Sequence, residues 1–526
     1  MSIRSTLVSL FGAALIAACA NSMAPAPQTA PSEVATQNTV TLLFTNDVES
    51  AYDPIPAFWI DGLAHIGGVA EMSTLITRIR AQEPNVFLFD AGDIFTGSLA
   101  KETLGRLSFD LMSAMDYDAM AIGNHEFEYG HDVLAWEKNR APFPVLGANL
   151  FYKDTDHPFA QAHTIIERGG IRIGVIGIMG QDAATALIPS HIAALDVRDP
   201  APVVQKSVDA LRDEVDLIVL LTHQGKTAPM QTDAETDPRL QRDIDADINL
   251  AGAVTGVDVL FAGHADAGTP EPVVHPKTGT LIMQTYGQAT HLGYLQLTLD
   301  PTTCKIAAYD GKLIVVDSDA LTPDPLIADK LTRQRAAFPE LYDVIGETRA
   351  PMVRRYIEES DVGNLFADIF RAASDADIGL VHSGSLRKDL PEGPVRRVDI
   401  LDTYPFVDSI VKLRLTGTQL REVMEQSLSL ERGILQVSGL EVIYDLDQPV
   451  GARLVSLRRD GHEIGDEETL TTAIAGFLAE GGDLYATFPK TETIATFGKV
   501  SDELFDHFAT SSPVNTPSRG RQRAVD

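Results

Sequence analysis

The chain has 526 residues, of which 44% are apolar and 22% are charged. At about 150 residues per domain this length predicts two or three domains, and the composition excludes a disordered chain, a collagen and a multi-span membrane protein. Lysine and arginine number 42 against 74 aspartates and glutamates, a net charge of −32 that argues against nucleic-acid polymers as partners. A small phosphorylated substrate remains compatible, because a bound metal ion reverses the charge locally.

The first residues predict an exported protein. Arg4 precedes a short apolar run over residues 7–20, which is too short to span a bilayer comfortably and is typical of a secretory signal. Within it, Ile-Ala-Ala-Cys ending at Cys19 resembles a bacterial lipobox. We predict a signal peptide over 1–19, a lipid on Cys19 as the only membrane contact, and a periplasmic or cell-envelope location; the alternative is simple cleavage one residue later. Residues 20–38, rich in Ala, Pro, Ser and Thr, are expected to form a flexible tether.

Short apolar runs in the first half predict buried strands. Helical patterns lie between several of the runs, for example over 66–80 and 203–212, and this alternation predicts an α/β core with helices covering the sheet. Ligands of such folds lie beyond the carboxyl ends of the strands. The runs cover residues 41–44, 86–89, 118–122, 217–221 and 257–262.

Polar residues whose side chains can bind metal ions follow these runs. The candidate metal ligands are Asp47, Glu49, Asp93, Asn124, His223, His264 and Asp266. Their oxygen and nitrogen atoms suit two divalent cations that share a bridging carboxylate, for which Asp93 is the candidate. The first site would add Asp47, Glu49 and Asp266 to that bridge, and the second would add Asn124, His223 and His264. His125 follows a ligand directly and is free to act on an oxyanion or a leaving group. Any one of these residues alone would more often be a helix cap or a hydrogen-bonded structural residue.

The order of these motifs resembles a known family. Asn-Asp-Val-Glu, Gly-Asp, Gly-Asn-His-Glu, Thr-His-Gln-Gly and Gly-His occur in the order of the calcineurin-like metallophosphoesterases. Residues 117–127 resemble the bacterial and cell-surface 5′-nucleotidases in particular, and the resemblance extends over about residues 40–500. It implies a four-layer α/β/β/α metallophosphoesterase domain, a linker helix and an α/β (α+β) C-terminal domain.

The second half of the chain supports a separate domain. Residues 324–338 show helical periodicity after a Pro-containing stretch, which predicts a helix between two domains. The expected divisions are a dimetal phosphoesterase domain over 39–320, a linker helix and hinge over 321–342, a substrate-specificity domain over 343–512 and a tail over 513–526.

Candidate substrate residues lie in this second domain. Phe406 and Phe477 neighbour turn-forming Pro or Gly, and they either pack in the core or stack a planar base between them. Asp483 follows two glycines and could accept hydrogen bonds from ribose, and the fork of Arg387 suits phosphate. The resemblance to 5′-nucleotidases implies these same roles, with Gly384 in the turn that Arg387 ends. It also implies one more arginine, Arg354 or Arg355, whose register stays open.

Several positions depart from the family pattern. Glu49 stands where the family usually has His, Asp266 where it has Gln, Asn or His, and Glu128 where an Asp orients the catalytic His. His382 replaces an Asn, and Ser383 and Ser385 replace glycines. Carboxylates favour hard cations. We therefore expect Mn, Mg or Ca in the Asp47/Glu49/Asp93/Asp266 site and Mn, Fe or Zn in the Asp93/Asn124/His223/His264 site.

The resemblance implies hydrolysis of nucleoside 5′-phosphates to nucleoside and phosphate by metal-activated water. Asn124 and His125 would stabilise charge on the phosphoryl group, and Glu128 would hold the His125 ring. One alternative is a UDP-sugar or cyclic-nucleotide phosphohydrolase; a thiosulfate-pathway sulfate hydrolase fits the aromatic pair less well. Another is a non-catalytic nucleotide-binding lipoprotein. The nucleotide, the metals and the oligomeric state stay open.

Overall fold

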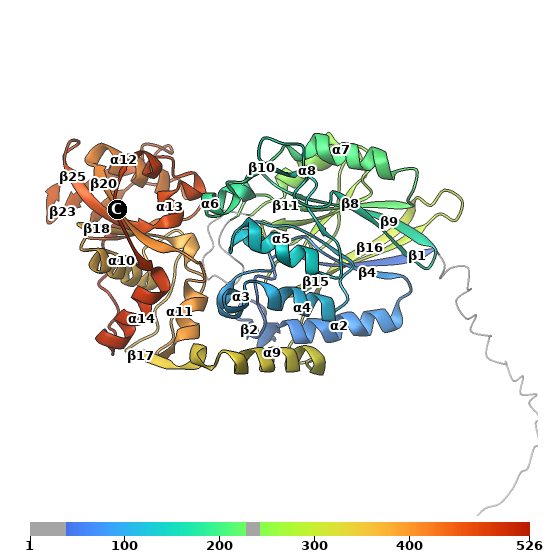
Figure 1. The fold of residues 1–526 in the computed structure, drawn as a ribbon, viewed down its shortest axis with the longest axis horizontal. Coiled ribbons are helices and arrows are strands. Elements are labelled where there is room, and N and C mark those ends of the chain that lie inside the picture. The colour runs from blue at the N-terminus through green and yellow to red at the C-terminus, as the bar shows by residue number, and fades with distance from the viewer. Residues whose placement is uncertain (1–37, 228–241, 526) are drawn as a thin grey trace, which may run out of the picture.

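Two α/β bodies joined by a helix make up the molecule (Figure 1). The computed structural model describes residues 38–227 and 242–525. The expected signal peptide, Cys19 and nearly all of the expected tether lie outside these residues. No helix within the described ranges combines the length and the apolar character needed to cross a bilayer.

The first six-stranded sheet belongs to the N-terminal body. Its strands are, in spatial order, β16 (Ile306–Val315), β15 (His291–Leu299), β1 (Thr39–Thr45), β4 (Val86–Asp90), β5 (Ala119–Ala121) and β6 (Val145–Leu146). The run from β1 to β6 is parallel, and β15 and β16 add antiparallel strands at one side. The carboxyl ends of β1, β4 and β5 therefore lie at the same edge.

A second six-stranded sheet packs against the first. Its order is β13 (Val273–Val274), β14 (Leu281–Gln284), β12 (Val259–His264), β11 (Leu217–Gln224), β9 (Ile171–Met179) and β8 (His163–Arg168). β9, β11, β12 and β14 run parallel. Small antiparallel pairs also occur in this body, β2 (Pro54–Pro56) with β3 (His65–Gly67) and β7 (Leu150–Tyr152) with β10 (Leu195–Val197).

Alternating side chains explain the layering of this body. Every second residue of the central strands enters the core between the sheets, where the rings of Phe44 and Phe261 stack 4.1 Å apart. Their neighbours point outward, as Leu43 does toward the helices of the first sheet and Ile218 toward those of the second. The first set of helices is α2 (Val69–Gln82), α3 (Gly97–Thr103), α4 (Arg106–Ala114) and α5 (His131–Arg140), and the second is α7 (Pro200–Leu211) and α8 (Asp245–Ala253). The expected α/β/β/α architecture is confirmed.

The helix between the bodies is α9 (Pro325–Ala337). Asp324 caps it, accepting a hydrogen bond from the Leu326 backbone N–H at 2.8 Å, and a proline opens its first turn. Ile327 and Leu331 are buried against the helical layer of the first sheet. The expected linker helix is therefore present, and it packs on the N-terminal body.

The C-terminal body is built on a five-stranded sheet. Its order is β21 (Leu435–Ser438), β18 (Ile378–His382), β25 (Thr469–Ala475), β20 (Ser409–Thr416) and β26 (Glu492–Lys499). α10 (Asp361–Ser374) and α14 (Val500–Ser511) bury apolar side chains with one face of the sheet, and α12 (Gly417–Ser427) does so with the other. Beside it lie the pair β17 (Val344–Thr348) and β19 (Gly393–Arg396), followed by α11 (Arg397–Thr403), and the short α13 (Gly476–Ala479).

The last residues differ from the separate tail expected over 513–526. β27 (Gln522–Ala524) pairs in parallel with β22 (Glu441–Tyr444), in a four-stranded sheet completed by β23 (Leu454–Arg459) and β24 (His462–Glu463). Arg521 also donates two hydrogen bonds of 2.7 Å to the carboxylate of Asp368. The segment is an edge strand of the C-terminal body, and its pairing partner lies about eighty residues earlier, where no local pattern reveals it.

Two of the contacts between the two bodies differ in kind. Leu401 of α11 is buried in the apolar cluster on the helical side of the first sheet. Elsewhere, Ser190 in α6 (Pro189–Ile192) donates from its backbone N and its Oγ to the carboxylate of Glu480, at 2.8 and 3.0 Å. In Figure 1, α6 and α13 lie next to each other at the boundary between the two bodies. One contact is apolar and the other is polar.

Candidate functional site

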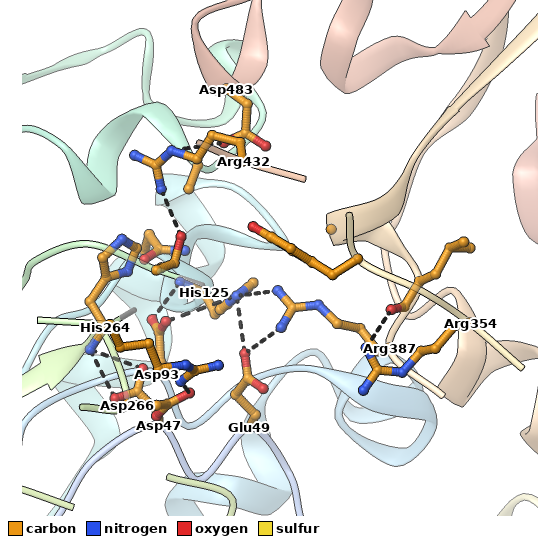
Figure 2. A pocket seen from close by; sticks show the side chains of 17 residues that line it. Asp47, Glu49, Asp93, His125, His264, Asp266, Arg354, Arg387, Arg432 and Asp483 are labelled. Carbon is orange, nitrogen blue, oxygen red and sulfur yellow. Dashed lines mark hydrogen bonds and ion pairs between the residues drawn. The ribbon is translucent and has the colours of Figure 1, made fainter. Parts of the chain in front are cut away.

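The carboxyl ends of strands from both sheets meet at one place, beside the C-terminal body. Asp47 and Glu49 follow β1, Asp93 follows β4 and Asn124 follows β5. His223 lies near the end of β11, and His264 ends β12. Figure 2 shows the labelled carboxylates and His264 gathered around a shared space. One cavity of about 90 Å³ is lined by Asp47, Glu49, Asp93, Asn124, His264 and Asp266, together with His125 and residues of the C-terminal body.

Asp93, His223 and His264 form the tighter part of this site, which we call the histidine half. Each offers an atom within 4.8 Å of the others, and all three are buried. His223 Nδ1 lies 2.8 Å from the carbonyl of Ala91, to which it donates. Its Nε2 therefore faces Asp93 Oδ2 at 2.9 Å and Asn124 Oδ1 at 3.2 Å. A backbone acceptor behind a ligating histidine fixes the tautomer that a metal requires.

His264 supports a cation at this position. Its Nε2 is buried and has no hydrogen-bond partner among the described residues. Burial, together with neighbouring His223, lowers the pKa of His264 well below its ordinary value, so the ring is neutral. A buried, neutral and unpartnered imidazole nitrogen next to an ionised carboxylate has the chemistry of a metal ligand. The donor set of the histidine half therefore fits a divalent cation.

The carboxylate half, Asp47, Glu49 and Asp266, is already engaged by donors. Asp47 accepts from the backbone N–H of His264 at 2.8 Å. Glu49 Oε1 lies 3.2 Å from Arg387 Nη1, and Asp266 Oδ2 lies 3.0 Å from Arg242 Nη1. Burial raises the pKa of Asp47 to about 7 and that of Asp266 well above its ordinary value. The expected ligands are thus close together. Arg387 and Arg242 partly neutralise the negative charge of these carboxylates, as a bound cation also would.

The backbone at these residues is unusual. Five of the candidate ligands have a left-handed φ, between 45° and 74°: Asp47, Glu49, Asp93, His264 and Asp266. Such φ values are uncommon outside glycine and concentrate at functional sites. The backbone of one turn also lies very close to a candidate ligand. A Cβ added at Gly123 would lie 2.2 Å from Asp93 Oδ1, so this position requires glycine. The chain thus accepts local strain in order to aim these side chains.

Glu126 braces the turn that carries Asp93. Its buried carboxylate accepts three backbone N–H bonds, from Asp93 at 2.9 Å, Ile94 at 2.8 Å and Gly123 at 2.6 Å. It therefore ties the end of β4 to the end of β5. Glu126 belongs to a recognisable motif, but its bracing role could not be predicted, because the N–H groups that bond to it follow two separate strands.

His125 lies between the two bodies. Its Nδ1 is 2.8 Å from Glu128 Oε1, and its Nε2 is 3.3 Å from Arg387 Nη2 and 3.4 Å from Glu49 Oε1. Burial lowers the pKa of His125, but nearby carboxylates, Asp93 and Glu128 foremost, outweigh burial and raise it to about 9. The arrangement brings together the pair that the sequence suggested, with Glu128 positioned to orient the ring.

The C-terminal body contributes arginines to the same cavity. Arg387 reaches toward Glu49 and His125 (Figure 2), and Arg354 and Gly384 also line the cavity. Arg355 does not line it. Asp483 does, with its carboxylate 3.8 Å from Arg432 Nε. Arg432, which the sequence analysis did not single out, also donates to Thr227 Oγ1 at 3.2 Å across the domain boundary.

Phe406 and Phe477 line one adjoining cavity of about 60 Å³. Both rings are half-buried. The Phe406 ring stacks with His125 at a centroid distance of 6.0 Å and an angle of 25°, and Arg387 lies 5.5 Å above its face. The two aromatic residues thus share a cavity that His125 and Arg387 also line.

Comparison with known families supports the same two bodies. Residues 40–265 match the calcineurin-like phosphoesterase family, and residues 344–490 match the 5′-nucleotidase C-terminal domain. The crystal structure of a 5′-nucleotidase precursor from Thermus thermophilus superposes with a TM-score of 0.81 at 25% identity, covering 93% of this chain and 99% of that one. The expected two-domain fold is confirmed.

Sequence relatives cover both bodies. Snake venom 5′-nucleotidase from Naja atra is 28% identical over 503 residues, which cover 85% of this chain and 91% of that protein. Endonuclease YhcR from Bacillus subtilis is 28% identical over 495 residues, which cover 90% of this chain. The match covers only 39% of the Bacillus protein, so the chain spans well under half of that relative's length.

Proposed function

We propose that this chain, which belongs to the 5′-nucleotidase family of metallophosphoesterases, hydrolyses nucleoside 5′-phosphates to nucleoside and phosphate. The observation that carries the proposal is the convergence of metal-type ligands with Arg387 and an aromatic-lined cavity across the domain boundary. Phosphate, sugar and base then each have a neighbouring group of matching chemistry.

Divalent cations held by the two halves would supply Lewis acidity, drawing charge from phosphoryl oxygens and lowering the pKa of water. Arg387 would hold a phosphoryl oxygen through its fork, since its guanidinium already lies against Glu49 and His125. Nearby carboxylates raise the pKa of His125 to about 9, which favours the protonated ring, and His125 would donate from Nε2 to an oxygen that gains charge. Glu128 would accept from Nδ1 and keep the ring in that orientation.

The substrate's base would stack on Phe406 and Phe477, and Asp483 would accept from the ribose hydroxyls. Of the two candidate arginines, Arg354 is the one that lines the metal cavity, so we assign it to the phosphate. A catalytic group that contacts Phe406, as His125 does, suits a substrate whose base lies close to its phosphate.

Ligand hardness suggests unequal metals. The carboxylate half, with Asp93 as the bridge, would hold Mn, Mg or Ca, and the histidine half with Asn124 would hold Mn, Fe or Zn. Export and a lipid on Cys19 belong to the same proposal and rest on the N-terminal sequence. Fractionation of cells that carry wild type or Cys19→Ala tests them, since the variant should leave the membrane fraction.

The deciding experiment measures phosphate release from AMP by metal-stripped protein after addition of Mn²⁺, Mg²⁺, Ca²⁺ or Zn²⁺. We expect turnover with at least one of these ions. Phe406→Ala and Phe477→Ala should weaken AMP binding by about 1–3 kcal/mol and affect p-nitrophenyl phosphate, which has no nucleobase, much less. A protein that binds AMP but releases no phosphate with any ion would be a nucleotide-binding protein instead.

A further inference from the structure

The two rings of the aromatic cavity come from distant parts of the chain. Phe406 lies between α11 and β20, and Phe477 lies in α13, which follows β25 directly. β20 and β25 are antiparallel neighbours in the five-stranded sheet, and at this end their register stops at the pair of Ile410 with Ala475. Both aromatic residues lie beyond that pair, where the hydrogen-bond ladder no longer sets the distance between the two segments.

Asp408 joins the two segments beyond the end of the ladder. Its side chain is buried, and its Oδ2 accepts a hydrogen bond from the backbone N–H of Phe477 at 3.1 Å. Its Oδ1 accepts one from the backbone N–H of Ser409, where β20 begins, at 2.7 Å. Burying a carboxylate is costly unless the group is hydrogen-bonded, so these two bonds hold the side chain in place.

The first turn of α13 depends on this carboxylate. The N-cap residue of α13 is Ala475, whose side chain cannot accept a hydrogen bond, so the first N–H groups of the turn need an acceptor from elsewhere. Asp408 supplies that acceptor from the neighbouring segment. The fit is close, because a Cβ added at Gly476 would lie 2.7 Å from Asp408 Oδ1. The position of Phe477 is therefore coupled to that of Asp408.

Asp408 is itself fixed on the side of Phe406. Its backbone carbonyl accepts a hydrogen bond of 2.9 Å from the backbone N–H of Val500, the first residue of α14, and Phe406 stands only two residues earlier in the chain. The Asp408 side chain also lines the aromatic cavity together with Phe406 and Phe477. The carboxylate is thus a tether at the wall of the cavity, between a fixed segment and α13.

We propose that Asp408 is a positioning residue, which holds Phe477 at a fixed distance from Phe406 and so sets the width of the aromatic cavity. The inference rests on the proposed stacking of a nucleobase there, and it adds the residue that keeps the two rings ready for the base. A gap of about 0.5–1 Å forfeits roughly a quarter to a half of the contact energy between two surfaces, so a displaced α13 weakens stacking. Asp408 does not line the metal cavity, so the bond-breaking step does not depend on it directly.

The test compares AMP with ribose 5-phosphate, which is AMP without its base, in the metal-loaded protein. In Asp408→Ala, KM for AMP should rise about tenfold, the scale of one weakened ring stack, while kcat for AMP and KM for ribose 5-phosphate stay close to wild type. Asp408→Asn keeps one acceptor oxygen and should give a smaller rise; it carries the test if Asp408→Ala does not fold. Asp377→Ala is the matched control and should leave both KM values unchanged. Asp377 accepts from the backbone N–H of Thr471 in the same sheet, at 2.8 Å, but does not line the aromatic cavity.

A second pair of substrates separates positioning from direct contact with the base. AMP and UMP have different polar edges, but both bases have faces that stack, so their KM values should rise by similar factors in the Asp408 variants. The inference is overturned if KM for AMP is unchanged in both variants, if ribose 5-phosphate loses as much as AMP, or if the loss is confined to one base. If wild type releases no phosphate from AMP with any ion, the proposed function fails. Calorimetric Kd values for AMP then replace KM, and a wild type that does not bind AMP overturns the inference as well.

Discussion

The side chains of the two halves of the metal site are held together by different kinds of contact. In the histidine half, buried donors face one another, and His264 Nε2 has no partner among the described residues. In the carboxylate half, every carboxylate is held by a donor, Glu49 by Arg387 and Asp266 by Arg242. The first half is arranged for a cation, whereas the second must release an arginine to receive one. We therefore expect the histidine half to load first and to bind more tightly.

Removing the residue shared by both halves should have the largest effect. Asp93→Asn keeps the size of the side chain but loses the charge that lies 2.9 Å from His223. Both cations should bind far more weakly and turnover should be abolished, as measured by metal analysis and AMP hydrolysis. A variant with two bound metals and near-normal activity would remove Asp93 as the bridge.

His125→Ala should separate catalysis from metal binding. His125 contacts Glu49 and Arg387, and its Nε2 lies 3.9 Å from Asp93 Oδ2, against 2.9 Å for His223 Nε2. Turnover should fall by about two to four orders of magnitude while metal content stays close to two. Glu128→Gln is the matched milder change, since it keeps a hydrogen-bond acceptor for Nδ1. Loss of metal in His125→Ala would show that the histidine is a ligand.

Metal affinity should respond to pH differently in the two halves. Burial lowers the pKa of His223, but Asp93 and Asp47 outweigh it and raise the pKa to about 10 in the metal-free protein. A cation must displace that proton, so affinity of the histidine half should rise about tenfold per unit between pH 7 and 9. In the carboxylate half, Asp47, with a pKa raised to about 7, contributes a rise in affinity mainly below that pH, and Asp266, whose pKa is raised well above its ordinary value, adds a further rise as it ionises. Calorimetric titrations at three pH values measure both, and parallel slopes would contradict the comparison.

The smallest expected effect is a change in which metal ion the carboxylate half prefers. Glu49→His replaces a hard oxygen ligand by imidazole without altering the position. The carboxylate half should shift by several-fold from Mg²⁺ or Mn²⁺ toward Zn²⁺, read from competition between ions. Asp53→His, a similar change on an exposed residue that does not line the metal cavity, is the control. Wild type that carries two zinc ions, or an unchanged preference in Glu49→His, would show that ligand hardness does not govern this site.

The sequence predicted the site best where a candidate ligand directly follows a strand. Asp47 and Asp93 could be placed together because the parallel strands β1 and β4 end at one edge, and period-two burial stacks on them the second sheet, whose β12 ends at His264. Arg242 and Arg432 could not be anticipated, since each reaches the site from a loop through contacts that depend on the packed fold. The pairing of β27 with β22 was missed for the same reason. The choice between Arg354 and Arg355 also required the folded structure, because only Arg354 of the two lines the metal cavity.

The unlike contacts between the two bodies bear on how fast the proposed reaction could turn over. Separating Leu401 from its cluster would expose apolar surface, whereas Ser190 and Glu480 can exchange each other for water at little cost. Widening of the cavity is therefore expected to begin at the α6–α13 side and to pivot about α11. Nucleotide and nucleoside are larger than the metal cavity. The rate of this opening motion would therefore limit the rate of product release. Glu480, which lines neither the metal cavity nor the aromatic one, would then act on the rate of release and leave the bond-breaking step unchanged.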